Sequence, residues 1–233
     1  GMAFELAKRK GCEVTGISLS KNQIEYCKRK AKELNLDNQV TFELKDFRDV
    51  KGKYDYVTSI GAWEHFLKRN YLTALRKIYE IMSDKGVCIL HTIGSILPPQ
   101  PNAPFIQRYI FPDGEIPHES DMAKNIEKSG LIMSDRETLI RHYDKTLEAW
   151  LKRFLKNKDI VKDLFDQKFV KMWEFYLASC SAAFKYRDLV VFQYQLVKNF
   201  DAIPSNRRDY IYSWWVSAIN KIADEKKEKI KKN

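Results

Sequence analysis

The stretch Tyr54-Asp55-Tyr56-Val57-Thr58-Ser59-Ile60-Gly61-Ala62-Trp63-Glu64-His65-Phe66 decides the fold and locates its chemistry. Its first half is rich in β-branched and aromatic side chains, which is typical of a strand, and the strand ends at Gly61. A carboxylate, an imidazole and two aromatic rings follow directly. Open α/β sheets bind ligands at the carboxyl ends of their strands, so this segment is the candidate site.

Strands and helices are expected to alternate on both sides of this segment. A helix over 2–10 ends at Gly11, and Ser20 with Gln23 forms a capping-box pattern before a helix that runs to about Leu36. The other expected elements are strands at 13–17, 39–44, 54–60, 87–92, 131–141 and 189–198, and helices at 70–82, 119–128, 144–157, 159–166 and 168–186. This alternation predicts an α/β fold with a doubly wound parallel sheet.

The order of the elements departs from a doubly wound domain in one respect. Such a domain opens with a strand and a glycine-rich turn, whereas this chain opens with the helix over 2–10. We therefore expect the first, central strand to be missing from the sequence and the sheet to split or to expose edges on both sides of the gap. Another segment, or a second copy in a homodimer, would fill the gap.

The composition limits the class of protein and its partners. A net charge of +10 over 233 residues points to an anionic partner, either a nucleic acid or a membrane surface, with plain solubility as the alternative. The aromatic residues cluster in apolar helices rather than between basic residues, which disfavours nucleic acid. No apolar run approaches the roughly 18 residues of a membrane span, and no signal peptide is evident. Four cysteines without CxxC spacing favour a reducing cytoplasm and disfavour a zinc site.

Two segments stand apart from the alternating pattern. Residues 94–118 contain six prolines and many large apolar side chains, which is typical of a lid or of an element that touches a membrane. Residues 213–233 form a basic tail that begins close to Trp214 and Trp215 and carries six lysines against three acidic residues from Lys221 onwards. The tail suits contact with anionic lipid, and a solvated charged helix is the alternative.

A series of motifs follows the order and spacing of one family. The motifs are Gly16-Ile-Ser-Leu-Ser-Lys-Asn-Gln23, Ser59-Ile-Gly-Ala-Trp-Glu-His-Phe66, Leu90-His-Thr-Ile-Gly94, Tyr109-Ile-Phe-Pro-Asp-Gly114, His142-Tyr143-Asp144 with Thr146, Leu147 and Trp150, Tyr176-Leu-Ala-Ser-Cys180, and Phe192-Gln-Tyr-Gln-Leu196. Over residues 1–212 the chain resembles the cyclopropane-fatty-acyl-phospholipid synthases and the similar mycolic acid cyclopropane synthases. The specificity lies in the order and spacing rather than in any single motif.

The resemblance implies an S-adenosylmethionine-dependent methyltransferase domain over 1–212, with Rossmann-like topology and with lid or acyl-binding insertions at about 94–118 and 142–186. It implies methyl transfer to the cis double bond of an unsaturated phospholipid acyl chain, followed by proton loss that closes a cyclopropane. Such a protein would be cytoplasmic and would act at the inner face of the membrane.

The resemblance also implies the site residues. The active-site positions are Glu64, His91, Tyr143 and Cys180, of which the first three surround a bound bicarbonate that serves as the base. The cofactor positions are Ser18 and Gln23 at the ribose, Asp46 and Phe47 at the adenine, and Ile60 as a wall of the pocket.

The implied chemistry requires a dry pocket. An alkene is a weak nucleophile, so the methyl donor must be a sulfonium, and its attack leaves a carbocation that water would trap. Aromatic faces stabilise positive charge and exclude water. The rings available are Trp63, Phe66, Tyr143, Trp150 and Tyr176. The alternative is that these rings are ordinary core.

Each implied residue also has a plainer interpretation. Glu64 has the alternative of being a solvated loop residue. His91 has the alternative of being a core histidine, and Cys180 that of being an inert buried thiol. Helix capping explains Gln23 nearly as well as ribose binding does. We expect His65 to pack against, or to cap, the helix that follows it.

The chain departs from the family in two respects. The glycine-rich cofactor loop and its strand would lie upstream of Gly1, and so would a helical segment that supplies another active-site cysteine. We therefore expect either a fragment of a longer protein or a product that starts at Met2. The competing functions are methyl transfer without ring closure, and a catalytically silent or incomplete family member that acts as a lipid-binding or interaction module.

Overall fold

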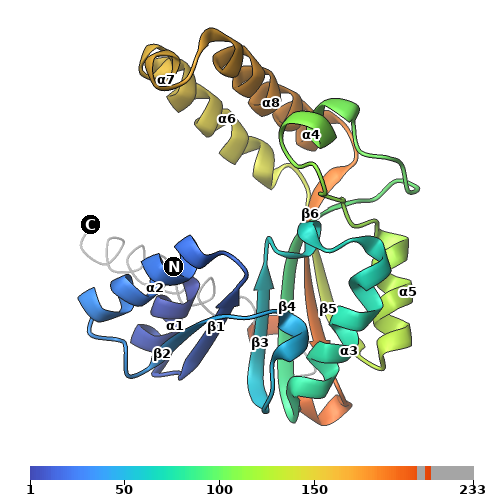
Figure 1. Ribbon diagram of the computed structural model, residues 1–233. Helices are drawn as coiled ribbons and strands as arrows, with labels where there is room; N and C mark the ends of the chain where they lie inside the picture. Colours follow the sequence, from blue (N-terminus) through green and yellow to red (C-terminus); the bar gives the residue numbers. More distant parts are fainter. Residues whose placement is uncertain (204–207, 211–233) are drawn as a thin grey trace, which may run out of the picture.

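The computed structural model describes residues 1–203 and 208–210 (Figure 1). Its strands are β1 (Val14–Ser18), β2 (Val40–Leu44), β3 (Tyr54–Ile60), β4 (Met82–Ser95), β5 (Ile132–Leu139) and β6 (Leu189–Val197). Its helices are α1 (Met2–Lys10), α2 (Lys21–Glu33), α3 (Tyr71–Ile81), α4 (Pro104–Tyr109), α5 (Glu119–Ser129), α6 (His142–Lys156), α7 (Lys158–Leu164) and α8 (Gln167–Tyr186). The mixed α/β fold is confirmed, and the basic tail at 213–233 lies outside the described residues.

The strands form two separate sheets. One holds β1 and β2, and the other has the order β3-β4-β6-β5. The pairs β1–β2 and β3–β4 are parallel, but no pairing joins β1 to β3. The expected split of the sheet is therefore confirmed, and Figure 1 shows the two sheets side by side.

Strand β6 departs from the expected parallel sheet. It runs antiparallel to both β4 and β5 and lies between them. Its sequence predicts a buried strand, but a run of buried β-branched and aromatic residues does not reveal strand direction. The position of β6 matters for the site because it brings Gln193 directly opposite His91.

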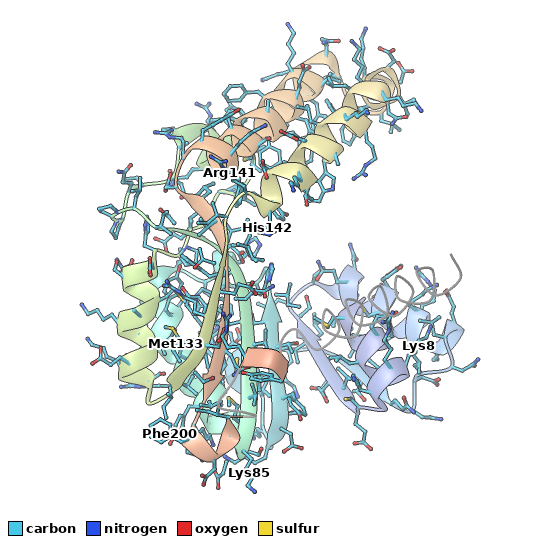
Figure 2. The ribbon with its side chains drawn as sticks, turned by 180° about the vertical axis from the view of Figure 1, so that it is seen from behind. Lys8, Lys85, Met133, Arg141, His142 and Phe200 are labelled. Atoms are coloured by element: carbon cyan, nitrogen blue, oxygen red, sulfur yellow. The ribbon has the colours of Figure 1, made fainter. Side chains whose placement is uncertain are left out.

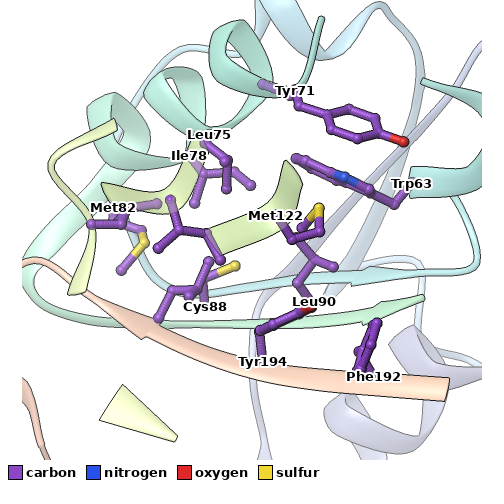
Figure 3. Close-up of a cluster of buried hydrophobic side chains, with 14 of the residues drawn as sticks. Trp63, Tyr71, Leu75, Ile78, Met82, Cys88, Leu90, Met122, Phe192 and Tyr194 are labelled. Carbon is purple, nitrogen blue, oxygen red and sulfur yellow. The ribbon is translucent and has the colours of Figure 1, made fainter. Parts of the chain in front are cut away.

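The larger core lies between the four-stranded sheet and helices α3 and α5, which pack together (Figure 3). It includes Leu75 of α3, Leu90 of β4, Met122 of α5 and Phe192 of β6, all with no exposed surface. A smaller core joins α1 and α2 to the two-stranded sheet through Phe4, Ala31 and Val40, among others. Each sheet thus has a hydrophobic core of its own.

The helix boundaries follow local signals. The Ser20 hydroxyl accepts a hydrogen bond from the Gln23 backbone N–H at 3.4 Å, which confirms the cap of α2. Gly11 ends α1 with φ 64°, a left-handed conformation in which glycine carries no steric cost.

The segment 94–118 is less irregular than the sequence suggests, because it contains α4. This helix begins at Pro104, where the missing N–H is harmless, so a proline that reads as a breaker is a helix start. The segment packs on α8 through Phe105 against Phe175, with ring centroids 4.7 Å apart, and through Phe111 against Tyr176 at 6.3 Å.

Helices α6 and α8 form an antiparallel hairpin that projects from the sheet, with α7 at its far end (Figure 1). Its base packs on the sheet through Leu147, Leu177, Phe184 and Val191. No described helix is both long and apolar enough to cross a bilayer.

Candidate active site

The Glu64 side chain binds the hydrogen-bonding edge of β4 just beyond the end of β3. Ile60 pairs with His91, and the Gly61 N–H still donates to the His91 carbonyl at 3.0 Å. The chain then turns away at Gly61, whose φ is 64°. The next donor on the same edge, the Ile93 N–H, is bound by Glu64 Oε1 at 2.6 Å. The carboxylate is thereby tied to the sheet rather than solvated, which excludes the plain loop interpretation.

The second oxygen of Glu64 is the feature that requires explanation. Oε2 is buried and has no partner among the described residues. A buried carboxylate oxygen without a donor is costly, because it loses its hydration and gains nothing in return. An unsatisfied group of this kind requires an explanation, such as a catalytic role or a bound water or ion that supplies the missing donor.

His91 is half-buried beside Glu64 and bonds to the neighbouring strand. It does not end β4, as the sequence suggests, because β4 continues to Ser95; His91 lies instead next to the end of β3. Gln193 Nε2 lies 3.0 Å from His91 Nδ1. An amide N–H can only donate, so the neutral imidazole carries its hydrogen on Nε2. Burial lowers the pKa of His91, and the Glu64 carboxylate acts in the opposite direction.

Tyr143 and Cys180 extend the same cluster from the helical hairpin. Burial raises the pKa of the Tyr143 phenol, and the negative charge of Glu64 raises it further. The phenol therefore lies within range of that charge. Burial also raises the pKa of Cys180 to about 11, which keeps the thiol protonated. Tyr176 lies beside both groups, and burial raises its pKa to about 12. The structure therefore gathers Glu64, His91, Tyr143 and Cys180 in one region.

The aromatic residues expected to line the pocket divide into two groups. Trp63 is 1% exposed and packs in the larger core against Phe66 and Tyr71, so for this ring the core interpretation holds. Tyr143 and Trp150 contact each other at 6.1 Å on the hairpin. His65 does not cap a helix; its ring packs against Phe111 at 6.1 Å.

Ser18 and Gln23 meet at the carboxyl end of β1. The Ser18 hydroxyl donates to Gln23 Oε1 at 2.9 Å, and Ser18 Oγ accepts from the Ser20 N–H at 3.1 Å. Gln23 is exposed, and its amide N–H groups form no hydrogen bond with another residue that the structure describes. The pair belongs to the two-stranded sheet, whereas Glu64 and His91 belong with the four-stranded sheet.

Asp46, Phe47 and Ile60 lie between these two groups in sequence. Both Asp46 oxygens bind the Arg48 guanidinium, at 2.8 and 2.7 Å. These bonds and the Arg48 N–H lower the pKa of Asp46 to about 2, so it is ionised. Phe47 packs against Phe66 with centroids 4.9 Å apart, and Ile60 is 48% exposed at the end of β3.

Three polar residues of this region were not singled out in the sequence. Gln193 stands in the quoted motif 192–196, but its contact with His91 depends on the antiparallel register of β6. His118 is buried and ties down the proline-rich segment: its Nδ1 bonds to the Leu97 carbonyl at 3.1 Å, and its Nε2 accepts from the Gln100 N–H. The Glu115 N–H donates to the Glu64 carbonyl at 3.0 Å. Only pairing across the fold reveals these roles.

Known proteins resemble this chain over most of its length. The family model "Mycolic acid cyclopropane synthetase" matches residues 1–194. The cyclopropane-fatty-acyl-phospholipid synthase of Escherichia coli K12 is 32% identical over 193 residues, which is 83% of this chain and 49% of that protein. The S-adenosylmethionine-dependent methyltransferase UmaA of Mycobacterium tuberculosis is 29% identical over 198 residues, covering 79% of this chain and 69% of that protein.

The fold agrees with these matches. The solved structure of mycolic acid cyclopropane synthase CmaA1 with SAH and CTAB has a TM-score of 0.76 at 24% identity, covering 83% of this chain and 72% of that one. The chain spans about half the length of the Escherichia coli relative that it matches. Because the family model covers most of the sequence and the folds superpose, this chain belongs to the mycolic acid cyclopropane synthetase family.

Proposed function

We propose that this chain carries the acyl-modifying centre of an S-adenosylmethionine-dependent lipid methyltransferase. The reaction adds a methylene across the cis double bond of an unsaturated phospholipid chain and forms a cyclopropane. The observation that carries the proposal is the Glu64 carboxylate, whose buried Oε2 has no donor in the described part of the chain and which lies close to His91 and Tyr143.

Bicarbonate fits the donors and acceptors of this cluster. Its O–H would satisfy Glu64 Oε2, and its oxygens would accept from His91 Nε2–H and from the Tyr143 hydroxyl. His91 stays neutral because burial lowers its pKa, and it can therefore donate without adding a full charge. Glu64 would orient the anion, and the bound anion would supply the base that removes the last proton.

The cofactor side fits less completely. The exposed Gln23 amide and Ser18 present polar groups suited to ribose hydroxyls at the end of β1. Ile60 offers an apolar wall, but Asp46 would have to share its oxygens with Arg48 to reach an adenine amino group. Bound S-adenosylmethionine would supply the electrophilic methyl group. The half-buried Tyr143 and Tyr176 would keep water from the cation and face its charge.

The proposed reaction on phospholipid acyl chains takes place at a membrane. Phospholipid acyl chains are reached at a bilayer surface, and the excess of basic residues suits an anionic, cytoplasm-facing surface. The partners in this proposal are therefore unsaturated phospholipids within such a surface.

The test combines chemistry with one matched variant. The chain is incubated with S-adenosylmethionine, bicarbonate and vesicles of unsaturated phosphatidylglycerol, and the acyl chains are analysed by mass spectrometry for the gain of one CH2. Glu64→Gln is expected to lower the rate about 100-fold or more, because the bicarbonate base would lose the carboxylate that orients it and general base assistance is worth that much. Glu148→Gln, an exposed partner of Lys185, serves as the control and should not change the rate.

A catalytically silent lipid-binding module is the second candidate. The observation that favours it is that Ser18, one of the proposed ribose contacts, and the Glu64 cluster lie on two sheets that no strand pairing joins. Calorimetry with S-adenosylmethionine separates the candidates: lack of binding at millimolar ligand would rule out activity for this chain, whereas binding that Gln23→Ala weakens would favour the enzyme.

A further inference from the structure

The far end of the helical hairpin lacks a core of its own. The base of the hairpin is held by buried residues such as Leu147 and Leu177. From Leu151 to Phe169, in contrast, none of the residues is buried. Helix α7 lies within this stretch and is the part of the hairpin farthest from the sheet (Figures 1 and 2).

Large apolar side chains gather on this end and face solvent. Ile160 is 61% exposed, Leu164 is 71% exposed, and Phe165, which directly follows α7 as its C-cap, is 63% exposed. Ile160 and Leu164 are four residues apart and therefore share one face of the helix. We call these three residues the hairpin tip. Clustered exposure of this kind marks a surface that meets another apolar phase.

The charge around the hairpin tip indicates which phase that is. Residues 152–171 contain seven lysines and arginines against three aspartates, a net charge of +4. None of these basic side chains forms an ion pair with another residue that the structure describes. Exposed apolar side chains within a basic segment suit the interface of an anionic bilayer, where the rings and aliphatic chains enter and the ammonium groups meet the head groups.

An aromatic row leads from the hairpin tip toward the Glu64 cluster. Phe165 stacks on Phe169 with centroids 4.3 Å apart, Phe169 on Trp173 at 5.7 Å, and Trp173 contacts Tyr176 at 5.1 Å. The spacing of four and three residues keeps Phe169, Trp173 and Tyr176 on one face of α8, and Phe165 stacks on the first of them. Tyr176 packs in the same hydrophobic cluster as Cys180 and Tyr143, so the row ends beside the proposed site.

We propose that the hairpin tip inserts into an anionic phospholipid surface and that the aromatic row is the apolar path from that surface to the Glu64 cluster. The insertion rests only on exposure and charge. The role of the row as a path for an acyl chain rests on the proposed function.

Vesicle sedimentation tests the insertion without any chemistry. The full chain is mixed with vesicles of saturated phosphatidylglycerol and phosphatidylcholine, which hold no double bond to modify. The double variant Leu164→Ser/Phe165→Ser is expected to lower the partition coefficient between vesicle and water about tenfold or more, because each apolar side chain that enters the bilayer is worth at least that factor. Phe200→Ser, which changes a 75% exposed ring at the opposite end of the sheet, is the matched control and should bind like the parent (Figure 2).

The charge and the depth are tested separately. Lys158→Gln with Lys162→Gln should weaken binding to anionic vesicles severalfold and leave the weak binding to pure phosphatidylcholine unchanged. Phe165→Trp should gain fluorescence quenching from brominated lipid, and Phe200→Trp should not.

Two outcomes would overturn the inference. Equal partitioning of the parent and the Leu164/Phe165 variant would refute insertion by the hairpin tip. Binding that depends on the lysines alone, with capture of an acidic protein in place of vesicles, would assign this surface to a protein partner. If the parent chain shows no methyl transfer but its vesicle binding still depends on the hairpin tip, the result counts against the proposed function and not against insertion by the hairpin tip.

Discussion

Neutralising Glu64 should separate stability from activity. Glu64→Gln can keep an oxygen on the Ile93 N–H while removing the charge from the buried Oε2 position. Replacing a charged acceptor by a neutral one forfeits about 1 kcal/mol. Replacing the buried, charged Oε2 by a neutral amide NH2 recovers about 1–3 kcal/mol of the cost of burying an unpartnered charged group. We therefore expect Glu64→Gln to be as stable as the parent, or more stable by up to about 2 kcal/mol.

Glu64→Ala provides the contrast. Alanine leaves the Ile93 N–H without its acceptor at the point where β3 has already turned away. An unsatisfied N–H costs about 1–3 kcal/mol. For a chain of this size that corresponds to a fall in the melting temperature of about 2–4 °C per kcal/mol.

Urea unfolding followed by circular dichroism measures all three proteins. Glu148→Gln, whose salt bridge to Lys185 is exposed on both sides, should stay within about 0.5 kcal/mol of the parent and sets the scale. If Glu64→Gln proves as destabilised as Glu64→Ala, then the carboxylate is held for stability, and the argument that its free oxygen awaits a ligand is wrong.

Three further predictions follow from buried groups of the same sheet. In NMR titrations the pKa of His91 should lie below 6.5, its ordinary value, so the contribution of His91 to stability is complete above that pH and is lost as the pH falls through the folded-state pKa. Glu64→Gln should lower the pKa of His91 further, because the carboxylate charge that raises it is removed. A rise in this pKa would contradict the reasoning. Gly94→Ala should cost about 1–3 kcal/mol or more in chemical unfolding, because its Cβ would lie 3.0 Å from the Pro117 carbonyl and closer still to the Phe192 ring. Leu90→Ala should cost about 2–5 kcal/mol, while Ile89→Ala, on the exposed side of the same strand, should cost far less.

The sequence predicts the local elements better than their pairing. The strand at 54–60 and the helices at 2–10 and 119–129 lie almost where periodicity and capping residues put them, because those signals are local. The direction of β6 and its insertion between β4 and β5 are set by long-range packing, which no short pattern records. Helix α4 was not predicted, because Pro104 is interpreted as a helix breaker unless the helix is known to begin there.

The candidate site shows the same division. The positions of Glu64, His91, Tyr143 and Cys180 came from motif order, and the fold brings them into one region, but their roles stay predictions. Gln193 could not be assigned, since its contact with His91 exists only through the cross-strand register. Trp63 could not be told from a pocket residue until its neighbours in the core were known.

The two unpaired sheets bear on how cooperatively this chain unfolds. Each sheet has its own core, and no strand pairing couples them, so heating should melt the small β1–β2 unit before the β3-β4-β6-β5 unit, in two transitions rather than one. A ligand that touches Ser18 on one sheet and the Glu64 cluster on the other would add its binding free energy to both units at once. Binding of such a ligand would then make the two units unfold together in one cooperative transition.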